Sequence, residues 1–341
     1  MTILLVSPNW LGDAVMALPA AADVRRHQRT SRLAVAARSS VAGLWSMVPG
    51  VDEVVTLPKG RGLKRWAAIR EGAERLLAIG AGAAILLPNS LQSAVTARRA
   101  GVPERWGYRR HLRSVLLTRA VPMPRGRVHQ ADYYRHLVAA LGFPNADRVP
   151  RLDVPAPAVA AACDLLATEE WPPGAPLLGI APGAAYGGAK RWPPERFAAV
   201  ASALGRSHGL QPVLVGAAGD RGTACAIEAE LDKIRGSGTR PAINLAGRTS
   251  LAQLAGVLTR CAAFVSNDSG AMHLAAAVGT PVVALFGATD ERVTAPLAAR
   301  ARVVTADAWC RPCLLRECPL DHRCMLGLEA GAVAKAVGDL L

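Results

Sequence analysis

The chain has 341 residues, of which 51% are apolar and 19% are charged. That length is enough for two domains with separate cores and excludes a disulfide-stapled miniprotein, while the apolar content excludes a disordered chain. The 40 Lys and Arg against 26 Asp and Glu leave a net charge of +14, which favours anionic partners: nucleic acid, nucleotides, phosphorylated glycans or an acidic membrane.

The amino-terminal residues predict a cytoplasmic protein. Residues 1–11 contain no Lys or Arg, and Asp13 interrupts the apolar stretch, so the pattern is not that of an export signal. The longest uncharged stretch, residues 269–289, is broken by glycines and a proline, so no membrane span is expected.

The first half of the chain alternates short apolar runs with amphipathic stretches. Residues 3–6 predict a buried strand that leads through a short loop into a helix over residues 13–27. Further strands are expected at 33–36, 54–57 and 83–87, with a helix at 64–79. Such alternation is typical of a parallel, doubly wound sheet.

Prolines gather between residues 143 and 157 and predict a linker, which divides the chain into domains 1–150 and 151–341. Alternation then resumes, and we expect two αβα domains facing each other across a cleft, with the last helix a candidate to pack back on the first domain. The expected strands are residues 177–181, 212–215, 242–245, 263–265 and 282–285, and the expected helices are residues 195–206, 221–234, 251–260 and 270–278.

An Asp-Ser-Gly turn follows the expected strand 263–265 and opens a helix at once. The amides at such a helix start, with the helix dipole behind them, favour a phosphate, and Gly270 lets a ligand approach the backbone. The alternative is that Asp268 or Ser269 only caps the helix.

A second loop, residues 182–193, also lies between a strand and a helix and carries Lys190 and Arg191. It is expected at the carboxyl edge of the sheet, where open α/β sheets bind ligands. These cations suit phosphate oxygens, although they also fit a solvated loop.

Together these segments resemble the ADP-heptose:lipopolysaccharide heptosyltransferases, glycosyltransferase family 9. The resemblance covers nearly the whole chain, is weakest at 103–157, and is nearest in pattern to the enzymes that add the second heptose. Ala185 and Ala271 depart from it, where the family often has an acidic residue and Leu. The matching motifs are Asn9-Trp10-Leu11-Gly12-Asp13, Pro182-Gly183-Ala184, Lys190-Arg191-Trp192-Pro193, residues 244–251, Asn267-Asp268-Ser269-Gly270, Met272-His273, residues 284–289, and Cys310-x-x-Cys313 with Arg316-Glu317-Cys318-Pro319.

The resemblance implies a GT-B fold and an inverting transfer of heptose from ADP-heptose to a lipid A-Kdo-heptose acceptor, by a monomer that needs no cofactor for catalysis. It implies that domain 1–150 binds the acceptor and domain 151–341 the nucleotide sugar. The donor-binding residues would be Tyr186, Lys190, Arg191, Gly247, Arg248, Thr249, Asp268, Ser269, Gly270, Ala271 and His273, of which His273 fits packing equally well.

Asp13 is the expected general base, because a carboxylate can accept the proton of an acceptor hydroxyl, and Lys190 is expected to stabilise the leaving diphosphate. Without the resemblance, Asp13 would be interpreted as a helix cap. The expected acceptor-binding residues, which also fit an ordinary solvated surface, are Asn9, Trp10, Gly12, Lys59, Arg61 and Lys64.

Since this acceptor is lipid-anchored, we expect peripheral contact with the anionic inner face of the inner membrane through the first domain, including Arg61, Lys64 and Arg65.

Four cysteines, Cys310, Cys313, Cys318 and Cys324, are numerous enough for a tetrahedral structural zinc site, although their spacing matches no common zinc finger. Structural thiols explain them equally well.

Three rival functions stay open at this point. Another family 9 activity, such as addition of the first heptose, differs only in the acceptor. A nucleic-acid-binding protein with a zinc site would explain the charge, but basic residues are scattered and aromatic residues make up only 4%. A nicotinamide-dependent oxidoreductase would need a G-x-G-x-x-G after residues 3–6, and the sequence has none there.

Overall fold

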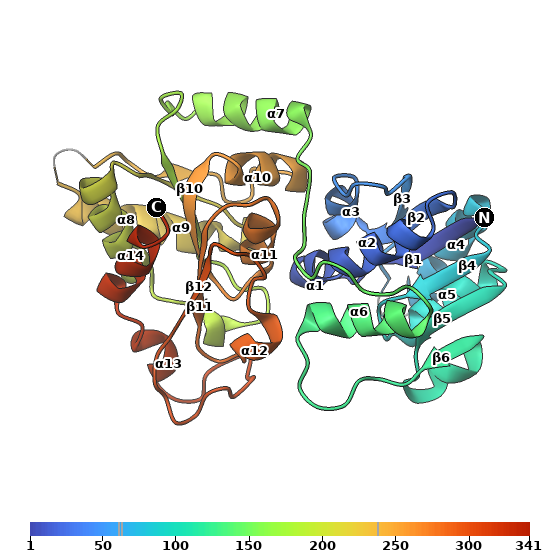
Figure 1. Cartoon of the computed structure of the whole chain (residues 1–341). Helices are drawn as coiled ribbons and strands as arrows, with labels where there is room; N and C mark the ends of the chain where they lie inside the picture. The colour runs from blue at the N-terminus through green and yellow to red at the C-terminus, as the bar shows by residue number, and fades with distance from the viewer. Residues whose placement is uncertain (61, 63, 237–238) are drawn as a thin grey trace. The chain divides into compact units, whose positions relative to one another are not determined.

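The computed structural model describes residues 1–60, 62, 64–236 and 239–341. The chain forms two compact units, Met1–Asp153 and Val154–Leu341 (Figure 1). Each unit contains one six-stranded parallel sheet, as the alternation of strands and helices predicts. Within the described residues, no helix is both long and apolar enough to cross a bilayer.

The first sheet has the strand order β3-β2-β1-β4-β5-β6, which is the order of a Rossmann fold. The order reverses between β1 and β4, and ligands of such sheets bind beside that point, at the carboxyl ends of the strands. The strands are β1 (Thr2–Val6), β2 (Arg32–Arg38), β3 (Glu53–Leu57), β4 (Ala83–Leu86), β5 (Glu104–Tyr108) and β6 (Arg119–Val121).

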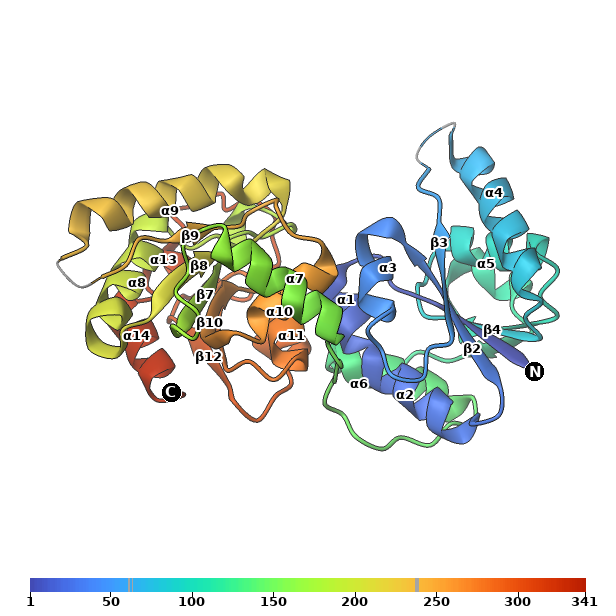
Figure 2. The same cartoon turned by 90° about the horizontal axis from the view of Figure 1, so that it is seen from above.

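Helices cover both faces of the first sheet. Leu4 and Val6 of β1 pack in one apolar cluster with Leu76 of α4 and Ala94 of α5, so these two helices cover one face. Figure 2 shows α2 and α3 on the other side of the strands. The helices are α1 (Leu11–Met16), α2 (Leu18–His27), α3 (Ser39–Trp45), α4 (Lys64–Ile79), α5 (Leu91–Arg99) and α6 (Gln130–Ala140), with a 3₁₀ helix, η1 (His111–Leu116).

The helix expected over residues 13–27 is in fact two helices. Pro19 lies in the first turn of α2, where its missing N–H and fixed φ suit a helix start but not a helix interior. The break at Ala17 ends α1 after six residues, and it leaves Asp13 in the first turn of a short helix.

The second sheet has the order β12-β11-β10-β7-β8-β9, which repeats the topology of the first. Its reversal point therefore lies between β7 and β10, which pair in parallel. The strands are β7 (Leu177–Ala181), β8 (Gln211–Leu214), β9 (Ile243–Asn244), β10 (Cys261–Asn267), β11 (Val282–Phe286) and β12 (Ala301–Thr305).

One face of the second sheet is covered by α8, α9 and α14, whose buried residues Phe197, Ile227 and Val333 share a core with Ile180 of β7. The last helix, α14, packs against α8 of this same unit. The helices are α7 (Ala156–Ala167), α8 (Pro194–His208), α9 (Arg221–Ile234), α10 (Leu251–Leu258), α11 (Gly270–Ala277), α12 (Glu291–Thr294), α13 (Arg323–Leu326) and α14 (Ala330–Gly338), with short 3₁₀ helices η2 (Gly188–Lys190) and η3 (Ala218–Asp220).

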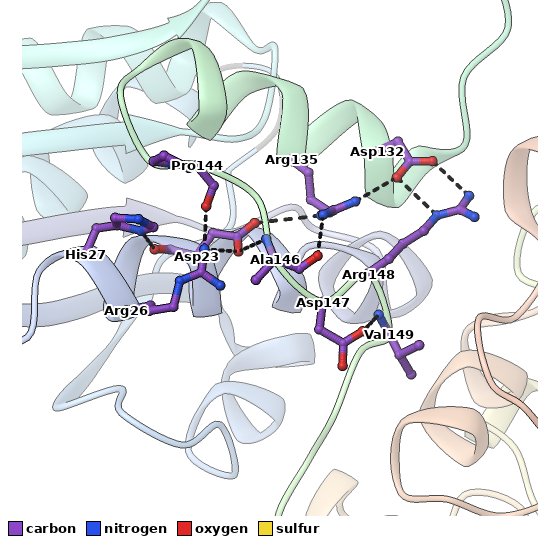
Figure 3. Close-up of polar contacts among 10 residues, drawn as sticks. All are labelled: Asp23, Arg26, His27, Asp132, Arg135, Pro144, Ala146, Asp147, Arg148 and Val149. Carbon is purple, nitrogen blue, oxygen red and sulfur yellow. Dashed lines mark hydrogen bonds and ion pairs between the residues drawn. The ribbon is translucent and has the colours of Figure 1, made fainter.

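A buried carboxylate fixes the segment that ends the first unit (Figure 3). Asp23 of α2 is 1% exposed, and its Oδ1 accepts a 2.9 Å hydrogen bond from the amide of Ala146. Arg26 and Arg135 form ion pairs with Asp23, and Arg135 also donates to the Ala146 carbonyl at 2.9 Å. Burial outweighs these contacts and raises the pKa of Asp23 above its ordinary value.

Candidate functional site

The loops after β7 and β10 meet at the reversal point of the second sheet, and a buried ion pair joins them. Lys190 Nζ lies 2.5 Å from Asp268 Oδ2, and Thr289 Oγ1 donates to the same oxygen at 2.7 Å. The side chains of Lys190 and Asp268 are 12% and 6% exposed. The structure thus brings together two residues that the sequence predicted for donor binding, and it adds Thr289, which follows β11.

Asn267 holds the same two loops in register. Its side-chain Nδ2 donates to the Pro182 carbonyl at 2.7 Å, and its Oδ1 accepts from the amide of Trp192 at 3.2 Å. All of these groups are buried, so both amide atoms are satisfied inside the protein. Asn267 therefore fixes where Lys190 lies relative to the start of α11.

The start of α11 has its amides available for an anion. Ser269 is the N-cap residue by backbone geometry, but no side-chain hydrogen bond caps the helix. Asp268 instead pairs with Lys190, so the alternative in which Asp268 or Ser269 caps the helix by its side chain is wrong. Gly270 and Ala271 form the first turn, and His273 is buried one turn further on.

Tyr186 connects Lys190 to a distant segment of the chain. The Tyr186 ring lies 4.9 Å from Lys190 Nζ and 5.3 Å from the Arg316 guanidinium, and its hydroxyl donates to the Leu314 carbonyl at 2.8 Å. Arg316 was part of a matching motif but was not predicted as a site residue, because nothing in its sequence position indicates a contact with residue 186.

The two glycines after Tyr186 permit this contact. A Cβ on Gly187 would lie 2.2 Å from the Arg316 carbonyl oxygen, and the amide of Gly188 donates to the Glu317 carboxylate at 3.1 Å. The backbone at Gly187 therefore lies directly against the backbone at Arg316. A side chain at residue 187 would displace the loop that carries Lys190.

The other predicted donor residues lie in two further loops. Gly247 has φ +72°, and a Cβ built on it would lie 2.7 Å from Ala218 Cα. Arg248, beside Thr249, is paired with Glu169 at 2.5 Å. Arg191 lines a surface hollow with His322, and neither Lys190 nor Asp268 lines that hollow.

The predicted base lies at the reversal point of the first sheet. Asp13 belongs to the first turn of α1, which follows β1, and Trp10 rather than Asp13 is the N-cap residue. Asp13 is close enough to the buried Tyr134 of α6 that its charge adds to burial in raising the pKa of that hydroxyl.

Asn9 lines a hollow at the carboxyl ends of the strands β1 to β4. Its polar lining includes Ser7, Arg38, Ser90 and Gln92, which were not predicted. Arg38 ends β2 and Ser90 follows β4, so the rule that ligands bind at strand ends was the available signal for both.

The remaining predicted acceptor residues are less enclosed. Trp10 is 60% exposed, Lys59 and Lys64 are exposed, and Gly12 is half-buried. Arg61 lies outside the described residues.

The four clustered cysteines are free thiols. Cys324 is buried, and burial together with the charges of Cys310, Cys313 and Cys318 raises its pKa. In the part of the chain that the structure describes, no group of three or more His, Cys, Asp or Glu side chains is arranged to hold a metal ion. The geometry therefore gives the zinc alternative no support over structural thiols.

Comparison with known proteins identifies relatives along most of the chain. The family model of glycosyltransferase family 9 (heptosyltransferase) matches residues 69–323. The chain is 33% identical to lipopolysaccharide heptosyltransferase 2 of Escherichia coli over 314 residues, covering 89% of this chain and 88% of that one. It is 28% identical to lipopolysaccharide heptosyltransferase 1 of Pseudomonas aeruginosa over 330 residues, covering 93% and 87%.

Solved structures agree with the sequence relatives. The E. coli ADP-heptose LPS heptosyltransferase II superposes with a TM-score of 0.84 and 28% identity, covering 100% of this chain and 98% of that one. The E. coli heptosyltransferase WaaC with ADP superposes with a TM-score of 0.75 and 21% identity over the whole of both chains. The predicted GT-B class, two Rossmann-like α/β domains, is therefore confirmed as the fold.

Proposed function

Because this chain belongs to glycosyltransferase family 9, we propose that it transfers heptose from ADP-heptose to the heptose of a lipopolysaccharide inner core, as heptosyltransferase II enzymes do. The observation that carries the proposal is the Lys190–Asp268–Thr289 cluster beside the start of α11. It fixes the Lys190 ammonium beside the amides at the start of α11, at the reversal point of the second sheet, where a nucleotide diphosphate would bind.

The donor half of the mechanism follows from that charge. As the bond between the anomeric carbon and the diphosphate oxygen breaks, negative charge grows on the departing ADP and positive charge on the sugar ring. Lys190 and the amides at Ser269 and Gly270 stabilise the departing phosphate, with Tyr186 holding Lys190 from the side. These groups are all supplied by the chain, so catalysis needs no cofactor in this scheme.

The acceptor half assigns the proton to Asp13. An acceptor hydroxyl oxygen attacks the anomeric carbon from the face opposite the diphosphate, which inverts the configuration, and its proton passes to the Asp13 carboxylate. Gly12 leaves room for the sugar beside that carboxylate. Asn9, Trp10, Lys59 and Lys64 would then contact the acceptor.

The acceptor class also explains the net charge. An inner core attached to lipid A carries carboxylates and phosphates and lies on an anionic bilayer, which attracts basic residues by about 1 kcal/mol each close to the surface. We assign the charge of +14 to this acceptor and this surface rather than to nucleic acid. The enzyme would thus act in the cytoplasm, peripherally at the inner face of the inner membrane, and we propose that it acts there as a monomer.

Product analysis with defined acceptors tests the function. The purified protein is incubated with ADP-heptose and either a core ending in Kdo or a core ending in the first heptose, and the products are weighed by mass spectrometry. We expect a gain of one heptose only on the heptose-terminated core. A gain only on the Kdo-terminated core would make it a heptosyltransferase I, and no gain on either would refute the proposal.

A further inference from the structure

Among the described residues of the first unit, six of the eight exposed large apolar side chains follow the ends of its parallel strands, and Met1 and Leu77 do not. Trp10 comes after β1, Trp66 after β3, Leu91 after β4 and Met123 after β6, and Leu112 and Val115 occupy η1, the connection after β5. Because the strands are parallel, their carboxyl ends share one edge of the sheet. Exposed apolar side chains therefore gather on and beside this edge.

The 3₁₀ helix η1 shows the strongest form of this exposure, because its polarity is inverted. Leu112 and Val115 are each 80% exposed, whereas Arg113 between them is 1% exposed. A surface helix ordinarily buries its apolar residues and leaves its cations in water. Two exposed aliphatic side chains beside a buried arginine need an explanation other than core packing.

Arg113 holds η1 in this orientation. Its Nη1 donates to the Pro88 carbonyl at 2.6 Å, and its guanidinium lies so close to β5 that a Cβ on Gly107 would be 2.5 Å from Nη2. Among the described residues, Nε and Nη2 have no hydrogen-bond partner, so the burial is costly. The fold thus pays a desolvation cost and presents Leu112 and Val115 outward.

The surroundings of these apolar side chains are strongly basic. Between Glu104 and Asp132 the sequence contains six arginines besides the buried Arg113 and no acidic residue. Between Glu53 and Glu71, around Trp66 at the start of α4, it contains five Lys and Arg and again no acidic residue. Exposed apolar residues with many cations and no acidic residue close by in the sequence match the composition of surfaces that bind anionic lipid.

We propose that this edge of the first unit, with Leu112 and Val115 of η1 and Trp66 of α4, inserts into the headgroup region of an anionic bilayer. The partner is the lipid surface itself, and the flanking arginines pair with its phosphates while the aliphatic side chains enter the acyl boundary. The inference rests on the proposed lipid-anchored acceptor, but it goes beyond charge attraction. It assigns part of the binding to apolar insertion, which salt does not screen.

The test compares two sets of serine substitutions in the full-length protein. L112S/V115S removes the two aliphatic side chains of η1, and L77S removes an equally large side chain that is 64% exposed in the later part of α4, away from the strand ends. Binding to vesicles of phosphatidylglycerol and phosphatidylcholine, and of phosphatidylcholine alone, is measured by co-sedimentation at low and high salt. Circular dichroism verifies that each variant is folded.

We expect wild type and L77S to keep measurable binding to anionic vesicles at high salt. L112S/V115S should bind them about tenfold or more weakly, and its remaining binding should vanish at high salt, because only the charge attraction is left. Binding of the double variant within twofold of wild type would overturn the proposal. So would a change in its oligomeric state by size-exclusion chromatography without a loss of vesicle binding, since the surface would then be a contact between protein copies.

Transfer assays separate this inference from the proposed function. The double variant should lose transfer to an acceptor embedded in vesicles and keep transfer to a water-soluble truncated core. If neither wild type nor variant transfers heptose to any acceptor, the proposed function fails, while the vesicle binding still decides the inference.

Discussion

The two sheets have the same strand order, yet their carboxyl edges are built differently. At the reversal point of the second sheet, Lys190, Asp268 and Thr289 form a compact hydrogen-bonded cluster that is largely buried. At the edge of the first sheet, Lys64 and Trp66 are exposed. The charges at the edge of the second sheet are held in place by the fold itself, whereas those at the edge of the first sheet are exposed to water.

We infer from the difference that topology decides where a ligand binds, while burial decides what kind of ligand the edge suits. A fixed, desolvated charge pattern recognises a small anion of constant geometry, such as a diphosphate. Solvated cations mixed with apolar side chains suit a large and variable surface. Four substitutions, two of them paired with a control substitution, can break or sharpen this contrast, and the first has the largest expected effect.

Asp13→Asn should lower the rate of transfer, which depends on the edge of the first sheet, without weakening ADP binding, which depends on the edge of the second sheet. Losing the base should lower kcat by about 10²–10⁴-fold, because proton transfer in the transition state is lost. ADP affinity should change by less than about 1 kcal/mol, since the nucleotide does not need the base. Steady-state kinetics and calorimetric ADP titration measure the two. Substantial residual turnover would remove Asp13 from the mechanism.

Lys190→Ala should damage both function and stability. It raises the donor KM and lowers kcat, because charge on the leaving diphosphate grows as the bond breaks. It also strands a buried carboxylate, which costs about 3–5 kcal/mol of unfolding free energy.

Lys64→Ala is the matched control at the first edge. It removes the same charge from an exposed site, so the unfolding free energy should change by less than about 0.5 kcal/mol. Equal effects of the two substitutions in denaturant titrations and donor kinetics would abolish the contrast between the edges.

Gly187→Ala should disturb the second edge without changing any charge. The new Cβ would lie 2.2 Å from the Arg316 carbonyl, and the forced movement should cost about 1–3 kcal/mol of stability and raise the donor KM. Gly222→Ala is the control, because nothing lies within 4 Å of that position in α9. Thermal melts and donor saturation curves compare them, and identical behaviour would show that the loop tolerates a side chain.

The smallest expected effect concerns pH and Asp23. Its pKa is raised in the folded protein, so the folded state binds more protons than the unfolded state in the window above the ordinary aspartate pKa. The contribution of Asp23 to stability is therefore full below that window and is lost as pH rises through the raised pKa.

Asp23→Asn should remove this pH dependence from the unfolding free energy of the first unit, measured by urea titration. The difference in unfolding free energy between wild type and variant should shift against wild type as pH increases through the window. A difference that is constant with pH, or that shifts the other way, would contradict the raised pKa.

Much of the fold was predictable because its central strands are continuous apolar runs. The predicted strand 177–181 and helices 64–79 and 221–234 coincide with β7, α4 and α9. Elements whose sequence conflicts with their structure were not predicted. β5 contains Glu104, Arg105 and a glycine, β12 is a largely exposed edge strand, and the prolines that begin α7 were interpreted as linker.

The site was predictable where one local motif carries the geometry. Asp268, Ser269 and Gly270 lie at a strand-to-helix turn that the sequence itself displays. The positions of Thr289 and Arg316 and the inverted polarity of η1 result from contacts between distant segments, so no local sequence pattern predicts them. The burial of Arg113 is the clearest case, because by composition it belongs to a basic surface patch.

The contacts around the Asp23 carboxylate place residues 144–149 inside the first unit rather than in a linker. By composition, residues 144–149 are linker, but the Pro144 carbonyl accepts from Arg26, the Ala146 amide donates to Asp23, and Arg148 pairs with Asp132. A fragment that ends at Phe143 would expose the side chains of Asp23, Arg26 and Asp132 without their partners in residues 144–148. A fragment that ends at Asp153 keeps all of these contacts. Trypsin should cut the intact chain close to this limit, after Arg151 before Arg148, because both side chains are ion-paired but that of Arg151 is 78% exposed and that of Arg148 is 46% exposed.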